Sequence, residues 1–339
     1  MKNAEEIDPC TLQTIVDSEE FFSIIKRVRF LKMNEDWIYS CGLCPRKCGT
    51  NRSKDLGRCA TPLIRDKNGE WCVPVARAAL HFWEEPCISG ENGSGAVFFS
   101  GCNLGCIFCQ NREISTGNVG KGVSVSRLCE IFFELEAEGA NNINLVTAAH
   151  VLPVVREALI MAKTKGLRIP ILYNTSSYET VESLKTLDGL VDIYLPDLKY
   201  MSSALSSRYS FAPNYPEVAK AAIAEMVRQT GPAVFDEHGL IAKGTIVRHL
   251  VLPGSSMDSK HVIHYLYETY GDEIYISIMN QYTPMPNVSA HSQLGKKVSD
   301  WEYKKIVDYA INLGVENGFV QDSSASDSDF IPKFDYTGV

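Results

Sequence analysis

The stretch AVFFSGCNLGCIFC, residues 96–109, joins a short apolar run to three closely spaced cysteines. Its first five residues are rich in β-branched and aromatic side chains and predict a buried strand. Cys102, Cys106 and Cys109 follow with the spacing C-x3-C-x2-C, so one compact loop presents three thiolates. Each thiolate can bind one iron of a cubane [4Fe–4S] cluster, which leaves the fourth iron without a protein ligand from this loop. Closed structural sites use four protein ligands, so an open position indicates chemistry.

A zinc loop and three simply buried thiols are the other interpretations of these cysteines. Three cysteines within eight residues make accidental burial a poor explanation. A zinc site needs a fourth ligand, and none is evident near the loop. The sequence therefore favours the cluster.

Short apolar runs alternate with amphipathic helices after this loop. Strands are predicted at residues 96–100, 143–146, 171–174, 192–195, 246–252 and 273–279, and helices at 126–139, 152–165, 178–187, 215–229, 259–270 and 300–313. Residues 235–243 read as a hairpin-like insertion before the fifth strand. Six strand–helix units predict parallel strands with right-handed crossovers, in an open sheet or a partial barrel. In either arrangement, ligands gather at the carboxyl ends of the strands.

The cysteine spacing, the aromatic residue before the last cysteine and the α/β array together resemble the radical SAM superfamily. Within it, SGCNLGCIFCQN (residues 100–111) is similar to pyruvate formate-lyase activating enzyme and its uncharacterised homologues, and the resemblance spans about residues 95–285. It implies an α/β fold, a partial (β/α)6 TIM-like barrel with a small N-terminal cysteine-rich extension. It also implies a [4Fe–4S] cluster and S-adenosylmethionine, which is reductively cleaved to a 5′-deoxyadenosyl radical that abstracts hydrogen from a substrate.

The resemblance assigns cofactor contacts to residues at the strand ends. It places the backbone of Phe108 near the adenine. At the second strand, activating enzymes usually carry a Gly-Gly-Glu segment that binds the amino group of the cofactor. Here residues 147–150 read Thr-Ala-Ala-His, so the carboxylate is missing and the Thr147 hydroxyl is left as the candidate. His150 is a candidate polar contact, although a core or capping role is favoured.

Polar residues also follow the third and fourth strands. Asn174, within the cluster at residues 173–177, suits ribose hydroxyls or the N-cap of the next helix, and both remain open. Asp197 and Lys199 share one side of a strand and match an Asp-Leu-Lys segment of the activating enzymes. A surface ion pair is the alternative. Arg248 and His249 on the fifth strand could line the substrate cavity, and no residue is assigned a catalytic role.

A second cysteine group precedes the α/β array. Cys41, Cys44, Cys48 and Cys59 have the spacing C-x2-C-x3-C-x10-C and supply four ligands, which predicts a closed structural or electron-transfer site. Zinc, a second [4Fe–4S] cluster and four reduced thiols all remain open. The basic residues around this group would stabilise thiolates or form an interaction surface: Arg46, Lys47, Arg52, Lys54 and Arg58. Four scattered cysteines are interpreted as small buried hydrophobes: Cys10, Cys72, Cys87 and Cys129.

Charge, the first residues and the length of the apolar runs limit the class of partner and the location expected for this protein. The 339 residues carry a formal net charge of -8, which disfavours a nucleic-acid partner. The start MKNAEEIDPC lacks the features of a secretory signal, and the apolar runs are too short for a membrane span, so a cytoplasmic protein is expected. We predict an N-terminal helical and cysteine-rich region (residues 1–90, with a helix at 18–32), a core (91–314) and a C-terminal tail (315–339), whose final segment docks back.

The function predicted from these features is that of an anaerobic oxidoreductase related to glycyl-radical-enzyme activases. It would abstract hydrogen from a glycyl residue of a partner enzyme and accept electrons from a flavodoxin or ferredoxin-type donor. Radical modification of a peptide or small metabolite is the first alternative. A non-catalytic iron–sulfur electron-transfer protein is the second, although it does not explain an open three-cysteine site.

Overall fold

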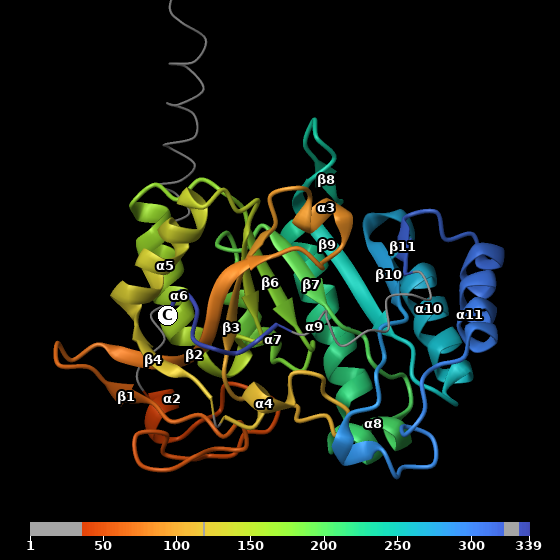
Figure 1. The fold of residues 1–339 in the computed structure, drawn as a ribbon, viewed down its shortest axis with the longest axis horizontal. Coiled ribbons are helices and arrows are strands. Elements are labelled where there is room, and N and C mark those ends of the chain that lie inside the picture. Colours follow the sequence, from red (N-terminus) through yellow and green to blue (C-terminus); the bar gives the residue numbers. More distant parts are fainter. Residues whose placement is uncertain (1–35, 118, 322–331) are drawn as a thin grey trace, which may run out of the picture. The chain divides into compact units, whose positions relative to one another are not determined.

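The computed structural model describes residues 36–117, 119–321 and 332–339 of the chain. The described residues belong to one compact unit, which spans Glu35–Val339. The predicted helix at residues 18–32 and the acidic segment at 322–329 lie outside the described residues. Within this unit, the strands form one large sheet and the helices pack around it (Figure 1).

The sheet has eleven strands, in the order β1-β2-β3-β5-β6-β7-β9-β10-β11, with β4 paired to β2 and β8 paired to β9. Its strands span β1 (Ile64–Arg65), β2 (Trp71–His81), β3 (Ser94–Phe99), β4 (Lys121–Ser124), β5 (Ile143–Val146), β6 (Ile171–Thr175), β7 (Ile193–Pro196), β8 (Val234–Phe235), β9 (Ile241–Leu250), β10 (Tyr275–Met279) and β11 (Gly318–Val320). From β3 to β11 every neighbouring pair along this order is parallel. The six predicted strands correspond to β3, β5, β6, β7, β9 and β10, so the parallel α/β fold is confirmed; its curvature into a partial barrel stays a prediction.

Helices precede, connect and follow the strands along the chain. They span α2 (Asp36–Tyr39), α3 (Pro86–Ser89), α4 (Arg112–Ser115), α5 (Val125–Ala137), α6 (Leu152–Thr164), α7 (Val181–Lys185), α8 (Ser203–Ser210), α9 (Tyr215–Thr230), α10 (Ser256–Tyr270) and α11 (Asp300–Leu313). Helices α5 and α6 pack on each other and against strands β2 to β5, while α9 packs on β7 and β9. Each buries one apolar face, as the helical spacing of its apolar residues requires.

The antiparallel side of the sheet was not predicted from the sequence. Strand β2 pairs antiparallel with β3, β1 and β4, so the predicted boundary at residue 90 falls between two neighbouring strands, and the three-part division of the chain stays a prediction. The chain end docks on β2, where the Ala78 amide donates to the Thr337 carbonyl at 2.9 Å. Phe334 packs edge-on against Phe98, with ring centroids 5.5 Å apart. The predicted docking of the final segment is therefore confirmed for residues 332–339.

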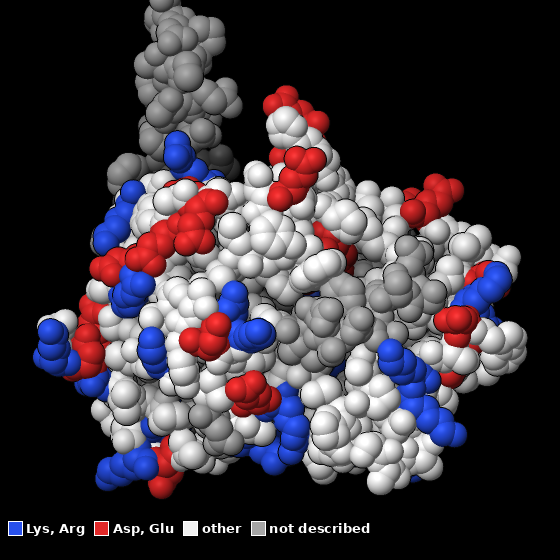
Figure 2. Space-filling view, in the orientation of Figure 1, with Lys and Arg blue, Asp and Glu red and all other residues white. Residues whose placement is uncertain are grey.

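The described helices include none long and apolar enough to cross a membrane. Figure 2 shows acidic and basic side chains in small groups of both signs across one face of the described residues. The electrostatic field over this face is therefore mixed in sign.

Two buried histidines make the stability of the fold sensitive to acid. His150 Nε2 lies 2.8 Å from the Ser100 carbonyl oxygen, and His249 Nδ1 lies 2.8 Å from the Leu198 carbonyl oxygen; the second ring nitrogen of each has no hydrogen-bond partner among the described residues. Burial lowers the pKa of His150 to about 3 and that of His249 to about 4. Both rings are therefore neutral in the fold at neutral pH.

We expect the free energy of unfolding to lose the contribution of these histidines as the pH falls. An unfolded histidine titrates near pH 6.5, so below that value the unfolded state binds more protons than the folded state. Each ring then costs up to about 1.4 kcal/mol per pH unit, until its folded pKa is reached. Urea unfolding at about pH 7 and pH 5 measures the slope, which His249→Gln should flatten and His238→Gln, on an exposed hairpin, should not. Equal slopes in wild type and His249→Gln would contradict this account.

Candidate functional site

A cleft opens at the carboxyl ends of the parallel strands. The space between its walls is about 1240 Å³, open mouth included. Every parallel strand from β3 to β10 contributes to its lining, either from its last residues or from the loop that follows. The cleft is lined in part by Cys102, Cys106, Phe108, Cys109, Thr147, Asn174, Asp197, Lys199, Arg248, Glu84 and Trp83.

The three predicted cluster ligands lie together in this cleft, on the loop after β3. Ser210 Oγ donates to Cys106 Sγ at 3.0 Å, and the Ile107 amide donates to the Tyr209 carbonyl at 2.9 Å, so the loop is held against α8. Burial, and then the neighbouring sulfurs of Cys106 and Cys102, raise the pKa of Cys109 to about 12. Such thiols lose their protons when a metal centre binds and supplies compensating positive charge.

The three thiols offer the ligand set of a cubane cluster, which attaches each thiolate to a different iron. The three half-buried sulfurs all line one cleft. In residues 36–117, 119–321 and 332–339, no group of three or more Cys, His, Asp or Glu side chains could hold a single metal ion. A [4Fe–4S] cluster on Cys102, Cys106 and Cys109 stays a prediction.

Phe108 is part of the core as well as of the cleft wall. Its ring meets Tyr209 and Tyr282 edge-on, with centroids 6.5 and 6.1 Å apart. Only 6% of its surface is exposed. The side chain thus anchors the cysteine loop, and a contact between its backbone and an adenine stays a prediction.

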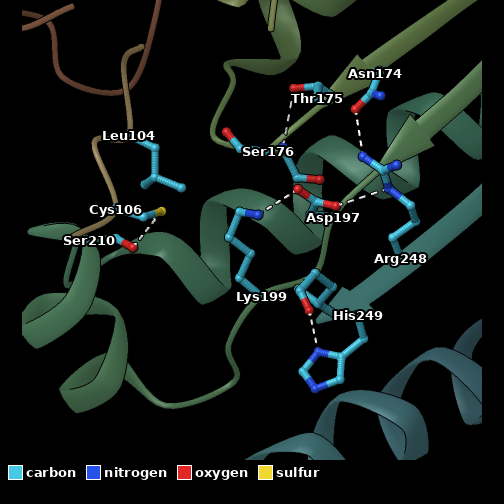
Figure 3. A network of polar contacts seen from close by, with 12 residues as sticks. Leu104, Cys106, Asn174, Thr175, Ser176, Asp197, Lys199, Ser210, Arg248 and His249 are labelled. Carbon is cyan, nitrogen blue, oxygen red and sulfur yellow. Dashed lines mark hydrogen bonds and ion pairs between the residues drawn. The ribbon is translucent and has the colours of Figure 1, made fainter. Parts of the chain in front are cut away.

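A buried polar network crosses the cleft, centred on Arg248 of β9 (Figure 3). Its Nη1 donates to Glu84 Oε2 at 2.9 Å, its Nε to Asp197 Oδ1 at 3.2 Å and its Nη2 to Asn174 Oδ1 at 2.7 Å. Arg248 and Asn174 lie on β9 and β6, Asp197 directly follows β7, and Glu84 lies in the connection between β2 and α3. Because a guanidinium presents its donors in a rigid planar fork, Arg248 fixes the position of all three partners.

Asp197 and Lys199 point into the cleft from the same side of the chain, as strand alternation predicts, while Leu198 is fully buried. Lys199 Nζ lies 2.6 Å from Asp197 Oδ2. Burial alone would raise the pKa of Asp197, but the charges of Lys199 and Arg248 hold it below its usual value. Burial likewise opposes the charge of Lys199, and Asp197 and then Cys106 raise its pKa. Both groups are therefore charged, and the lysine sets a positive charge near a cluster ligand.

Thr147 and Asn174, two of the predicted cofactor contacts, lie side by side at the ends of β5 and β6. Thr147 lies at the end of β5 with φ of 62°, a left-handed conformation that is strained for a β-branched residue. Its amide donates to the Asn174 carbonyl at 2.9 Å. The N-cap of α7 is Thr180, so the polar cluster at residues 173–177 does not cap that helix. Asn174 is free of that role and serves the Arg248 network. His150 lies beneath the cysteine loop, in the core and outside the cleft lining.

Glu84 and Trp83 were missed by sequence reasoning. Glu84 Oε1 accepts from Asn144 at 2.9 Å and from Asn174 at 3.3 Å, so this carboxylate links strands β5 and β6 to Arg248. It brings to the cleft an acidic group where residues 147–150 offer none. Nothing in the linker sequence EEP distinguishes it from a solvated loop, because only the pairing of β2 with β3 carries it to the cleft.

The second cysteine group also comes together, at the edge of the same loop. The Cys102 amide donates to the Cys59 carbonyl at 3.2 Å, so the two cysteine groups are directly hydrogen-bonded. Cys41 and Cys59 are buried, Cys44 is half-buried and Cys48 is exposed.

Comparison with curated proteins finds a relative of unknown function. The chain is 25% identical over 281 residues to the uncharacterized protein MJ0674 of Methanocaldococcus jannaschii, and the match covers 80% of this chain and 74% of that protein. No family model matches the chain.

Comparison with solved structures finds several similar folds. A domain of pyruvate-formate lyase-activating enzyme from Bacteroides vulgatus has a TM-score of 0.36 and 12% identity, over 51% of this chain and 92% of that one. SuiB of Streptococcus suis, bound to its precursor peptide SuiA, has a TM-score of 0.44 and 13% identity, over 65% and 46%. HydG, a maturase of the [FeFe]-hydrogenase, has a TM-score of 0.46 and 14% identity, over 94% and 68%.

Proposed function

We propose that this chain is a radical SAM enzyme. The observation that carries the proposal is the placement of Cys102, Cys106 and Cys109 on one loop at the carboxyl ends of a parallel strand array, where all three line a single large cleft. Three protein ligands leave one iron of a cubane open, and the cleft offers space for an organic cofactor beside it.

The residues of the cleft have separate tasks in this proposal. The three thiolates would hold the [4Fe–4S] cluster, and S-adenosylmethionine bound at its open iron would supply the radical chemistry when the cluster is reduced. Thr147, Asn174, Asp197 and Lys199 would hold the polar parts of S-adenosylmethionine, and Phe108 would border its adenine through its backbone. Arg248 would keep Asp197 and Asn174 in place. Burial of these groups strengthens their electrostatic contacts by excluding water.

The substrate we propose is a glycyl residue of a partner enzyme, as in activases. Trp83 supports a polypeptide substrate, because it lines the cleft and yet keeps 58% of its surface exposed. Exposed tryptophan is typical of surfaces that bind proteins. The same proposal places the chain in the cytoplasm with a flavodoxin or ferredoxin-type donor.

Modification of a peptide or small metabolite is the second candidate. Residues 147–150 favour it, because they lack the Gly-Gly-Glu segment usual in activating enzymes. The binding of the cofactor, and with it the pose of the substrate, then depends on other groups.

Production of 5′-deoxyadenosine tests the proposal. The protein would be reconstituted without oxygen using iron and sulfide, then given dithionite and S-adenosylmethionine. We expect 5′-deoxyadenosine only when all these components are present. A protein with an intact cluster that forms none would instead be a non-catalytic electron-transfer protein.

Electron paramagnetic resonance separates the two substrate classes. The reduced enzyme would be incubated with a purified glycyl-radical enzyme. A doublet signal from a glycyl radical on that partner supports activation. Consumption of S-adenosylmethionine without this doublet, accompanied by a mass change in a peptide or metabolite, supports the second candidate.

A further inference from the structure

Four thiols outside the cleft converge in the loop that precedes β1. The Cys41 amide donates to the Thr50 carbonyl at 3.1 Å and the Gly49 amide returns to the Cys41 carbonyl at 3.0 Å, which closes the first half of the loop on itself. A methyl group at Gly57 would lie 3.4 Å from Cys48 Sγ and 3.7 Å from Cys59 Sγ, so these two sulfurs flank one point in space.

The other pairs of sulfurs are near one another as well. The Cys44 thiol lies within electrostatic range of the sulfurs of Cys41, Cys59 and Cys48. Cys41 lies within the same range of Cys48 and Cys59. Each of the four thiols is thus close enough to the other three to feel their charge, although none is joined in a disulfide.

A buried arginine, Arg52, lies beside the cage formed by the sulfurs of Cys41, Cys44, Cys48 and Cys59, and its hydrogen-bond donors are not all matched among the described residues. Arg52 is 1% exposed, and its guanidinium donates to the carbonyl oxygens of His150 and Thr61. Its Nε has no hydrogen-bond partner among the described residues, and its positive charge acts on Cys41. A buried, unmatched donor is costly unless a ligand satisfies it. An anionic cluster in the cage would supply both an acceptor and the negative charge.

A single zinc ion and an iron–sulfur cluster place different demands on these cysteines. Zinc holds four sulfurs about 2.3 Å from one centre, and in the described part of the chain no three Cys, His, Asp or Glu side chains form a group that could hold one metal ion. A cubane cluster takes one thiolate on each of four irons, which is the ligand set that these four cysteines offer.

This cage is fastened to the ligand loop of the cleft. Arg46, between Cys44 and Cys48, donates from Nε to the Asn103 carbonyl and from Nη2 to the Leu104 carbonyl, both at 2.9 Å. Nη2 also donates to the Ser210 carbonyl at 3.0 Å, and the hydroxyl of the same Ser210 contacts Cys106. The Arg46 guanidinium therefore links the cage both to the loop that carries the cleft cysteines and to Ser210 at the end of α8, which contacts that loop.

We propose that Cys41, Cys44, Cys48 and Cys59 hold a second iron–sulfur cluster, fastened by Arg46 to the loop that carries the first. This site goes beyond the proposed function and exists whether or not the cleft is catalytic. Its four protein ligands leave no iron open, so it binds no substrate. Cys48 alone is exposed, which leaves one corner of the cluster facing solvent.

The iron and sulfide content of a variant without the cleft ligands tests the proposal. The full-length chain with Cys102→Ala, Cys106→Ala and Cys109→Ala would be reconstituted without oxygen and desalted. We expect about four iron and four sulfide per chain in this variant and about eight of each in wild type, since each cubane holds four of both. Adding Cys44→Ala and Cys59→Ala should remove the remaining iron.

A matched control removes two thiols elsewhere. Cys72→Ala and Cys87→Ala, added to the same triple variant, should leave the iron content unchanged, and circular dichroism checks that each variant is folded. A folded triple variant that binds no iron, or that binds zinc without sulfide, overturns the second cluster. If the triple variant instead holds as much iron as wild type, the second cluster stands and the proposed function fails.

Discussion

The Cys106→Ala variant is expected to form no detectable 5′-deoxyadenosine while keeping its fold. The cluster would be left with two protein ligands and could not present one open iron. The fold should survive, because the hydrogen bond between Ser210 Oγ and Cys106 Sγ is the one side-chain bond of Cys106 in the described structure, and a single bond contributes only about 1 kcal/mol. Chromatography of the reaction and urea unfolding measure the two quantities.

Cys129→Ala is the matched control. Cys129 is fully buried on α5 and lies outside the cleft lining. Its loss should cost about 1 kcal/mol of stability through packing and leave 5′-deoxyadenosine formation intact. Full activity in Cys106→Ala, or equal loss in both variants, would be irreconcilable with a cluster on the cleft loop.

The Arg248→Ala variant should have the largest effect on stability. Arg248 is 12% exposed and its partners Glu84 and Asp197 are 10% and 16% exposed, so removing it leaves Glu84 without this cation and Asp197 with Lys199 alone. Breaking a buried ion pair in this way typically costs about 3–5 kcal/mol. Urea unfolding measures the loss, and equilibrium dialysis should show weaker binding of S-adenosylmethionine by the reconstituted protein.

Arg127→Ala on the surface of α5 is the comparison for this variant. Arg127 also binds two carboxylates, Glu130 and Glu134, but it is 37% exposed and they are 61% and 51% exposed. Exposed pairs contribute about 0–1 kcal/mol, because water and salt screen them. Similar losses in the two variants would show that the Arg248 network is not a buried, interdependent unit. Arg248→Lys should recover only part of the loss, since one ammonium cannot reach all three partners as the planar fork does.

The secondary structure followed from local pattern. Strand β5 begins and ends where the apolar run at residues 143–146 does, and α11 coincides with the predicted helix at residues 300–313. Side-chain periodicity and end signals such as the Ser299 cap and Gly314 lie within a few residues of the structure they specify. The cysteine loop was recognisable for the same reason, since its three cysteines lie within eight consecutive residues.

Long-range pairing decided the rest of the site. Glu84 reaches Arg248, 164 positions away, only because β2 pairs with β3 and the intervening sheet brings β9 to the same cleft. Arg46 likewise donates to the carbonyl oxygens of Asn103 and Ser210, which lie 57 and 164 positions away in the sequence. The sequence by itself thus determined the six strand–helix units, the three thiols of the cleft and the second group of four, because each is a short-range pattern. Only the tertiary structure decided which charges meet in the cleft and that the two cysteine groups touch, because those contacts depend on where distant segments pack.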